Sequence, residues 1–356
     1  MEQFIKNVLI CISCILLFSC NKKRESDFFS IPVNTNENSS LSLSAIAENI
    51  EAIELEVTDE SIIGRIMDVL DTDDYYIIRD TKSVFLFDKK GKFIRRIGSV
   101  GQGPGEYVNI IDMAVDNNKE KIFISSFPRN LICYDFNGNF LKETQEARVF
   151  RNVTFVNNRL LALSEYVDSV DKNLHYIILY SIDGEKLSIT DSVEISRFSS
   201  EGIGATIYND FISNDSKNSY VFYTDYSSRT LVFDTLYSIN KQFQVTPYLK
   251  LNLSNNGYSI TGEKEIYMFS IYKSSRYVFV HYRNKNFNNY FCYDTKSEIG
   301  YNMVNGYTDD VHTMSKNVVI RPFDSDANKF YYSYTNIEES DNDEPNPTLY
   351  VGTLKK

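Results

Sequence analysis

The sequence predicts an all-β fold, a six-bladed β-propeller of mainly four-stranded antiparallel blades. A recurring segment supports this prediction: an apolar and aromatic run ends in Asp, and a turn and a second strand-like run follow. A repeat of about 50 residues that holds several short strands is typical of propellers. The five runs end at Asp88, Asp135, Asp183, Asp234 and Asp294.

Each of these runs has a partner strand ahead of it, and a sixth pair ends the sequence. The five partners read YYIIRD, KIFISS, LLALSE, SYVFYT and YVFVHY, and the sixth pair reads KFYYSYT and TLYVGTL. Six blades over residues 41–356 average about 52 residues each, whereas seven would each be shorter than every interval between the Asp residues. We expect residues 50–57 or the C-terminal TLYVGTL to close the ring, because unpaired strand edges are a liability.

The composition supports strands and argues against some partners. The chain holds 26 Tyr, 24 Phe and no Trp, and aromatic residues favour strands. Its net charge of −11 would repel DNA, so we expect no nucleic-acid partner. Cys11 and Cys14 lie in the N-terminal signal segment, and the rest of the chain has no Cys-x-x-Cys or Cys/His cluster that would indicate zinc. We expect Cys133 and Cys292 to be buried thiols.

The N-terminus has the pattern of a bacterial lipoprotein signal. Lys6 precedes the apolar run 8–18, which is too short to span a bilayer as a mature helix. Ser19 and Cys20 then fit a lipobox, in which the Cys receives the lipid; an ordinary signal peptide with an incidental Cys is the alternative. We expect a signal peptide (1–19), a polar linker (20–40) and the propeller (41–356), with the membrane reached through the lipid on Cys20 alone.

The stretch SVGQGPGEY, residues 99–107, is the densest turn signal in the chain. It lacks the Lys-Ser or Lys-Thr of a phosphate loop, a strand-like run follows it, and Glu106 would repel phosphate. We expect it to carry the chain from the outer strand of blade 1 to the innermost strand of blade 2. Glu106 and Tyr107 are candidate binding-face residues there, and a purely structural role is the alternative. The residues expected to make the turn are Gly101, Gly103, Pro104 and Gly105.

Taken in order, four segments resemble the six-bladed β-propeller lipoproteins that are abundant in Bacteroidetes, distant structural relatives of NHL-repeat propellers. They are the lipobox at Cys20, IELEVTDESIIGRIMDV, VFLFDKKGKFIRRIG and GQGPGEY. The resemblance implies the fold, export and an outer-membrane location, and it implies no settled activity. The residues after Cys20 are basic rather than acidic, so the sequence does not decide which leaflet of the membrane holds the lipid.

The sequence offers little catalytic chemistry. It has no Gly-x-Ser-x-Gly elbow and only three histidines, so we predict no catalytic residue. His312 follows Asp309 and Asp310 on a segment that opens blade 6, and these three complete the candidate binding face. Three oxygen-rich stretches could suggest calcium, but none has EF-hand spacing, and we expect solvated hairpin tips and no metal ligands. These stretches are 71–74, 324–328 and 339–344.

These observations favour a non-enzymatic function. The leading hypothesis is a monomeric, exported and lipid-anchored propeller that acts as a binding or scaffold module. Its partner would be a protein, a peptide or a glycan of the cell envelope, and no cofactor is expected. The alternative is a calcium-assisted hydrolase or lyase with its site in the central channel.

Overall fold

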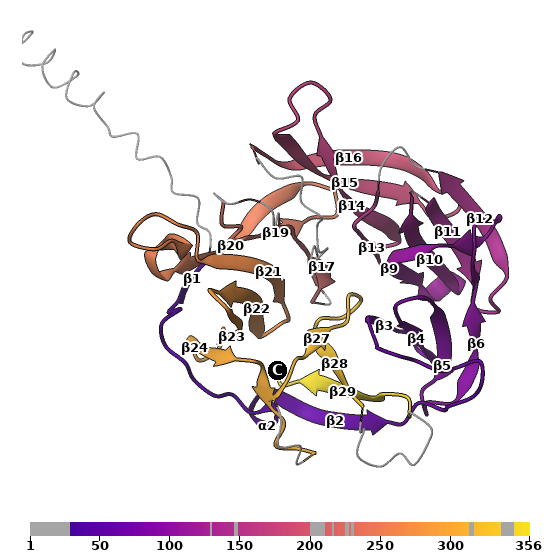
Figure 1. Cartoon of the computed structure of the whole chain (residues 1–356), viewed down its shortest axis with the longest axis horizontal. Helices are drawn as coiled ribbons and strands as arrows, with labels where there is room; N and C mark the ends of the chain where they lie inside the picture. Colours follow the sequence, from indigo (N-terminus) through magenta and orange to yellow (C-terminus); the bar gives the residue numbers. More distant parts are fainter. Residues whose placement is uncertain are drawn as a thin grey trace, which may run out of the picture.

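The computed structural model describes residues 29–128, 130–145, 149–199, 211–215, 217–224, 228, 231–312, 317–335 and 345–356. Within these residues six blade sheets stand in a ring around a central axis (Figure 1). The six-bladed propeller predicted from the repeats is therefore confirmed. No helix in these ranges is long and apolar enough to cross a membrane.

The first three blades each contain four consecutive antiparallel strands, which run in order from the innermost strand outward. Blade 1 holds β3 (Asp68–Asp71), β4 (Tyr75–Arg79), β5 (Val84–Asp88) and β6 (Phe93–Ile97). Blade 2 holds β9 (Asn109–Asp116), β10 (Lys121–Phe127), β11 (Asn130–Asp135) and β12 (Phe140–Gln145). Blade 3 holds β13 (Asn152–Val156), β14 (Arg159–Val167), β15 (Leu174–Asp183) and β16 (Ser188–Ser199).

Two of the other three blades take a strand from the N-terminus. Blade 4 holds β17 (Phe211–Asn214), β18 (Ser219–Phe222), β19 (Thr235–Ile239), β20 (Val245–Leu253) and β1 (Phe29–Val33). Blade 5 holds β21 (Ile266–Lys273), β22 (Tyr277–Asn284), β23 (Phe287–Asp294) and β24 (Ile299–Val304). Blade 6 holds β27 (Arg321–Pro322), β28 (Lys329–Tyr334), β29 (Thr348–Leu354) and β2 (Ala47–Ile53).

Short elements connect the blades. The helical ones are α2 (Leu43–Ile46), which precedes β2, and η2 (Ser254–Gly257), which lies between β20 and β21; a third, η1 (Asn117–Lys119), joins β9 to β10 within blade 2. Two small ladders pair β7 (Ser99–Val100) with β8 (Glu106–Tyr107) and β25 (Tyr307–Thr308) with β26 (Asn317–Val318).

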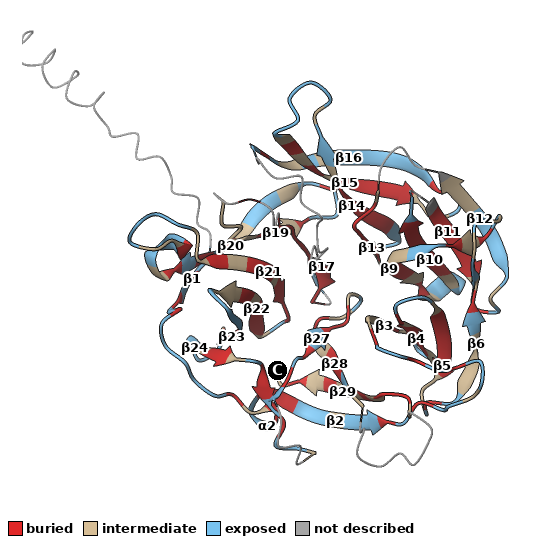
Figure 2. Cartoon of the chain, in the orientation of Figure 1, coloured by how far each residue is buried: buried red, intermediate tan, exposed pale blue. Residues whose placement is uncertain are grey.

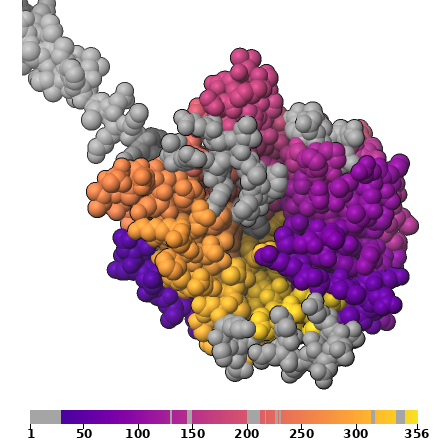
Figure 3. Space-filling model, in the orientation of Figure 1, coloured from indigo at the N-terminus to yellow at the C-terminus, as the bar shows by residue number. Residues whose placement is uncertain are grey.

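Residues 29–53 form a belt that joins three blades; we call it the N-terminal belt. Its strand β1 pairs in parallel with β20 of blade 4, and its strand β2 pairs antiparallel with β29 of blade 6. Between them, the buried Asn302 of blade 5 donates from Nδ2 to the Glu37 carbonyl at 2.9 Å and accepts from the Tyr282 hydroxyl at 2.8 Å. Figure 3 shows the indigo start of the belt against the orange part of the chain.

The N-terminal belt agrees with one prediction for this part of the chain and differs from another. The β2–β29 pairing closes the ring with an N-terminal and a C-terminal strand, as expected for residues 50–57 or the C-terminus. Residues 29–33, expected as part of the polar linker, instead form β1, in which Ile31 and Val33 are buried. Cys20 and the signal peptide lie outside the described residues.

Six clusters of buried apolar side chains hold the ring, and each lies between two neighbouring blades. In Figure 2 the outer strands β2 and β16 are largely pale blue, whereas β5 and β15 are largely red. Tyrosine fills much of this Trp-free core, and its hydroxyls find carbonyl partners, as Tyr134 does at 2.6 Å from the Gly105 oxygen. Cys133 and Cys292 are buried free thiols, as predicted.

The recurring Asp has a physical role in the hairpin turns between third and fourth strands. Asp88 Oδ1 accepts from the backbone N–H groups of Lys90 and Lys92. Asp183 Oδ1 accepts from the backbone N–H groups of Glu185 and Lys186. In such Asx turns the carboxylate takes the place of water as the hydrogen-bond acceptor for the backbone N–H groups of the turn. In blade 4 the match to Asp234 was wrong, because Asn240 occupies the turn and accepts there from Gln242 and Gln244.

We predict that Gly352→Ala destabilises the closed blade 6. Gly352 of β29 lies opposite Phe330 of β28, and a Cβ there would come within 2.3 Å of the Phe330 ring. Overpacking of this kind costs about 1–3 kcal/mol of unfolding free energy. Urea unfolding measures it, with Gly64→Ala as the control because no atom lies within 4 Å of its Cβ position. Equal stability of the two variants would contradict the prediction.

We also predict a pH-dependent contribution from Asp294 in blade 5. The Arg276 guanidinium, bonded to both carboxylate oxygens at 2.9 and 2.6 Å, holds the pKa of Asp294 well below its usual range. Because the folded pKa is the lower one, this stabilisation is present above the unfolded pKa of about 4 and is lost as the pH falls.

The control for this effect is Asp88→Asn, which alters the same kind of turn without an arginine partner in the described structure. At pH 7, Asp294→Asn should lower the unfolding free energy by roughly 1 kcal/mol more than Asp88→Asn does. Thermal unfolding followed from pH 7 to pH 3 should show this difference shrinking. A difference that stays constant with pH would refute the assigned role of the ion pair.

Candidate functional site

The ring has two faces, which differ in the chain segments that they present. We call one the crossing face, because the segments from the outermost strand of one blade to the innermost strand of the next lie there, as residues 98–108 do. We call the other the turn face. It carries the hairpin turns 72–74, 157–158 and 323–328, which join the first and second strands of blades 1, 3 and 6.

The segment 99–107 is the crossing from β6 to β9, as the sequence predicted, and its two candidate binding residues are engaged within it. Tyr107 is only 2% exposed, and its hydroxyl donates to the Ile97 carbonyl at 2.8 Å. Burial raises the pKa of Tyr107 to about 12. The geometry thus gives Tyr107 a structural position in the core between blades 1 and 2.

Glu106 folds back onto its own loop. Its Oε2 accepts from the Gly103 N–H at 2.8 Å, and a Cβ at residue 101 would displace this carboxylate from its present position, since the two would lie 2.0 Å apart. Gly105 adopts a φ of +71° beside the Phe140 ring. Pro104 and the glycines therefore shape a loop that closes around the Glu106 carboxylate.

The other three candidate residues anchor the segment after β24. Asp309 is 2% exposed; its Oδ1 accepts from the His312 N–H at 3.0 Å and its Oδ2 from the Tyr332 hydroxyl at 2.7 Å. Asp310 accepts from the backbone N–H of Ser44 in the N-terminal belt at 2.9 Å. The His312 ring lies 4.8 Å from that of Tyr350. These contacts do not bring the trio together with Glu106 and Tyr107 in one site.

The other two histidines are packed in the interior. His175 lies 2.5 Å from a Glu165 oxygen and stacks on the Phe198 ring. His281 lies against the rings of Phe269 and Tyr290, and its burial lowers its pKa to about 4.

Four cavities lie on the turn face, and all of them border the same hairpin. Their volumes are about 490, 740, 310 and 220 Å³, and we number them cavities 1 to 4 in that order. Each is lined by Asn157, Asn158 or both, which form the turn between β13 and β14 with φ values of 50° and 59°. Asn tolerates this left-handed conformation better than most residues. The Asn157–Asn158 turn is therefore the shared wall of the candidate site.

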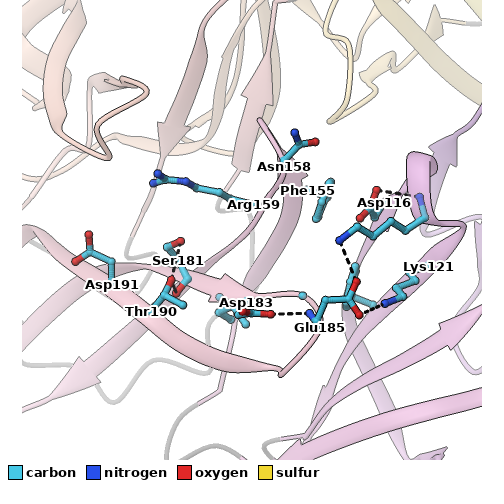
Figure 4. A pocket seen from close by; sticks show the side chains of 14 residues that line it. Asp116, Lys121, Phe155, Asn158, Arg159, Ser181, Asp183, Glu185, Thr190 and Asp191 are labelled. Atoms are coloured by element: carbon cyan, nitrogen blue, oxygen red, sulfur yellow. Dashed lines mark hydrogen bonds and ion pairs between the residues drawn. The ribbon is translucent and has the colours of Figure 1, made fainter.

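Cavity 1 lies between blades 2 and 3 (Figure 4). The Phe155 ring stacks on Phe123 with centroids 6.2 Å apart, which gives the cavity an apolar surface. Glu185 bridges Lys119 and Lys121 at 2.9 and 2.6 Å, and these bonds lower its pKa to about 2. The remaining polar groups at its wall come from Asp116, Asn158, Arg159, Ser181, Asp183, Thr190 and Asp191.

Cavity 2 lies at the mouth of the central channel and brings together two acidic stretches far apart in the sequence. Asp71 and Asp73 line it from blade 1, and Asp326 lines it from blade 6. Asp71 forms ion pairs with Lys89 and, at 2.8 Å, with Lys329. The Asp71 side chain is only 8% exposed, so the expectation of a solvated hairpin tip was wrong there.

The loop 323–328 also differs from a solvated tip, because it reaches blades 4 and 5. The Ala327 N–H donates to the Asn214 carbonyl of blade 4 at 2.6 Å, and Asn214 Nδ2 donates to the Asp324 carbonyl at 2.8 Å. Asn328 Oδ1 accepts from the Ser275 N–H at the end of blade 5. This loop therefore links blade 6 to blades 4 and 5 on the turn face. The third acidic stretch, 339–344, lies outside the described residues.

Three acidic residues on the inner strands of the ring were not predicted from the sequence. Asp68 and Asp112 come from β3 and β9, the innermost strands of blades 1 and 2, and Asp324 follows β27 of blade 6. Burial and the charge of Asp68 raise the pKa of Asp112 to about 7. The charge in the otherwise apolar run NIIDMAV was the available signal, because an innermost strand has little reason to hold an unpaired acid. No group of three Asp, Glu, His or Cys residues in the described ranges could hold a metal ion.

Comparisons with solved structures find chains that resemble this one along most of its length. A candidate exported protein from Bacteroides fragilis is 19% identical, with 92% of this chain and 100% of that chain aligned and a TM-score of 0.66. A protein of unknown function from Bacteroides caccae is 9% identical over 78% and 89% of the two chains, with a TM-score of 0.41. The Neurospora crassa Pan2 WD40 domain is 11% identical over 82% and 76%, with a TM-score of 0.42.

Comparisons of sequence give a family without a known activity. None of the curated proteins matches the chain. One family model, described as a domain of unknown function and designated DUF4934, matches residues 28–351. Since this match covers nearly all of the propeller, the chain belongs to the DUF4934 family.

Proposed function

We propose that this protein is an exported, lipid-anchored binding module whose turn face binds a glycan of the cell envelope. The observation that supports this proposal most is the set of four adjoining cavities around the Asn157–Asn158 turn. A row of adjoining cavities suits a chain of similar units better than one compact ligand. Concave sites with a few placed polar groups are where proteins usually bind such molecules.

The side chains of the cavities fit sugar chemistry. Sugar hydroxyls both donate and accept, and Asn amides can do both, whereas carboxylates accept and Lys or Arg donates. Asn158 and Asp116 line both larger cavities, and so does the half-buried Phe155. An aromatic ring among hydrogen-bonding groups offers the apolar face of a sugar ring a contact.

Arg159 is the most available donor in cavity 1. Its side chain is exposed, and no hydrogen bond or ion pair reaches its guanidinium from the described residues. In Figure 4 it stands beside Asn158, across the cavity from Thr190 and Asp191. A guanidinium whose five donors are available in this way suits a ligand that carries hydroxyl or acidic groups.

Export and anchoring rest on the sequence and on one structural neighbour. The lipobox at Cys20 implies a lipidated, exported protein, and the Bacteroides fragilis neighbour carries the description of a candidate exported protein. The nine residues from Cys20 to Phe29 span at most about 30 Å. The propeller would then stay close to its membrane, for which we propose the outer membrane.

The lipid anchor has a direct test. Cells that express the full chain should incorporate radioactive palmitate into it, and Cys20→Ala should abolish this labelling because the acceptor thiol is lost. Cys133→Ala is the control, since this buried thiol cannot reach the acyl donor. Labelling that persists in Cys20→Ala, or a wild type that is soluble and unlabelled, would refute the anchor.

Binding can be tested on a glycan array with the Cys20→Ala chain, which leaves every described residue unchanged. We expect retention of at least one envelope glycan and a loss of tenfold or more in affinity with Arg159→Ala, about 1.4 kcal/mol. Arg197→Ala is the matched control, because Arg197 is an exposed arginine on the outer strand β16. If no glycan is retained, or if both variants lose affinity equally, the proposed site is wrong.

A further inference from the structure

Cavity 3 differs in charge from the two larger cavities of the turn face. Four acidic and three basic side chains line cavity 1, and five acidic and two basic side chains line cavity 2. Cavity 3, of about 310 Å³, has no acidic residue at its wall and two basic ones, Arg159 and Lys241. The chain as a whole has a net charge of −11, so a cavity lined by cations alone needs an explanation.

Neither cation of cavity 3 is neutralised by a neighbour. Arg159 and Lys241 are exposed, and among the described residues no hydrogen bond or ion pair reaches either side chain. The lysines of the larger cavities are different, because each of them pairs with Glu185 or Asp71. Cavity 3 therefore keeps its positive charge available to a ligand.

The fold holds the two cations on neighbouring blades with the cavity between them. Arg159 directly follows the Asn157–Asn158 turn in the β13–β14 hairpin of blade 3. Lys241 lies in the β19–β20 turn of blade 4, which the side chain of Asn240 holds through its two backbone hydrogen bonds. Phe243 of the same turn is 5% exposed and lines the cavity. The backbone at both cations is thus fixed before any ligand arrives.

The rest of the wall suits a sugar ring. The side-chain amides of Asn157 and Asn158 are exposed and have no hydrogen bond within the described residues, so they can donate to and accept from hydroxyl groups. A volume of about 310 Å³ is within the range of small-molecule sites. The apolar part of the wall, which can contact the ring itself, comes from Val156, Leu161, Ile239 and Phe243.

The two cations favour an anionic group on that sugar over a neutral one. A planar guanidinium presents paired N–H donors that match two oxygens of one anionic group, and an ammonium group adds a second positive charge. Hydrogen bonds to an ionised acceptor are roughly twice as strong as those between neutral groups. The excess of acidic residues at cavities 1 and 2 would repel the same anionic group, which directs it to cavity 3.

We propose that cavity 3 binds the carboxylate or sulfate group of an acidic sugar, with Arg159 and Lys241 as its two cations. This proposal rests on the glycan site proposed for the turn face and adds that the glycan has to be acidic. The anionic group accepts from the guanidinium and the ammonium group, while Asn157 and Asn158 bond the hydroxyls of the same unit. Uncharged units of the glycan extend from there into the adjoining cavities.

A glycan array tests this proposal with the Cys20→Ala chain. Its acidic probes are oligosaccharides that carry galacturonate, glucuronate or sulfate esters, and each is paired with its uncharged methyl-ester or desulfated form. We expect at least one acidic probe to bind tenfold or more tightly than its uncharged form. Poly-glutamate is applied in parallel and should bind more weakly than that probe, because it has carboxylates but no sugar rings.

Variants of Lys241 test the site, because this residue lines cavity 3 and none of the other three cavities. Lys241→Gln should lower the affinity for the acidic probe tenfold or more, and Lys241→Arg should keep most of it. The matched control is Lys186→Gln, since Lys186 is an exposed lysine of the β15–β16 turn that lines none of the four cavities. Equal melting temperatures show that the variants are folded alike.

The outcomes separate this proposal from the one on which it rests. If no glycan binds, both are wrong. If the uncharged forms bind as tightly as the acidic probes, or if Lys241→Gln binds like Lys186→Gln, the glycan site stands and the anionic site in cavity 3 is overturned. Poly-glutamate that binds as tightly as the acidic probe would also overturn it, because charge alone would then be recognised.

Discussion

The pairing of β2 with β29 is the constraint on which the rest of the molecule depends. A propeller has no covalent closure, so its first and last blades stay together only through contacts between distant parts of the chain. Here the outermost strand of blade 6 comes from residues 47–53, and its register with 349–354 fixes the cluster of apolar side chains between blades 6 and 1. Without that closure the channel and the turn-face cavities would lose their geometry, because residues from blades 1, 2, 3 and 6 share cavity 2.

The two faces of the ring differ in what their polar side chains contact. On the crossing face, the two candidate binding residues of the segment 99–107 stabilise the fold. Tyr107 is buried, and the Glu106 carboxylate accepts a hydrogen bond from its own loop. The turn face is built from short hairpins whose side chains line the cavities. Polar residues collect there because tight turns select Asn, Asp and Gly. The chemistry offered to a ligand is thus partly a by-product of turn formation.

The architecture could be predicted from the sequence because it repeats. Strand alternation and the turn-forming Asp are local signals. The strand pair recurs six times, with the Asp at the turn in four of the copies, and this repetition predicts a ring of six blades. The predictions about individual side chains that were wrong concern residues whose neighbours are set only when the ring closes. Asp71 and Asp326 are separated by most of the chain, yet blades 1 and 6 are neighbours, so no local pattern shows that they share a cavity. The choice of Asp234 for the blade 4 turn failed for another reason: Asn240 makes the same turn, and the pattern sought only Asp.

The parallel pairing of β1 with β20 has a mechanical consequence. If Cys20 carries the lipid proposed above, any drag on the propeller reaches the body through Phe29, the first residue of β1. A pull along this strand loads its hydrogen bonds to β20 together, in shear, whereas a pull across it opens them one at a time. The direction of the applied force would therefore decide how long β1 stays paired with β20. A tethered ring of this design resists force best when it trails along the axis of β1.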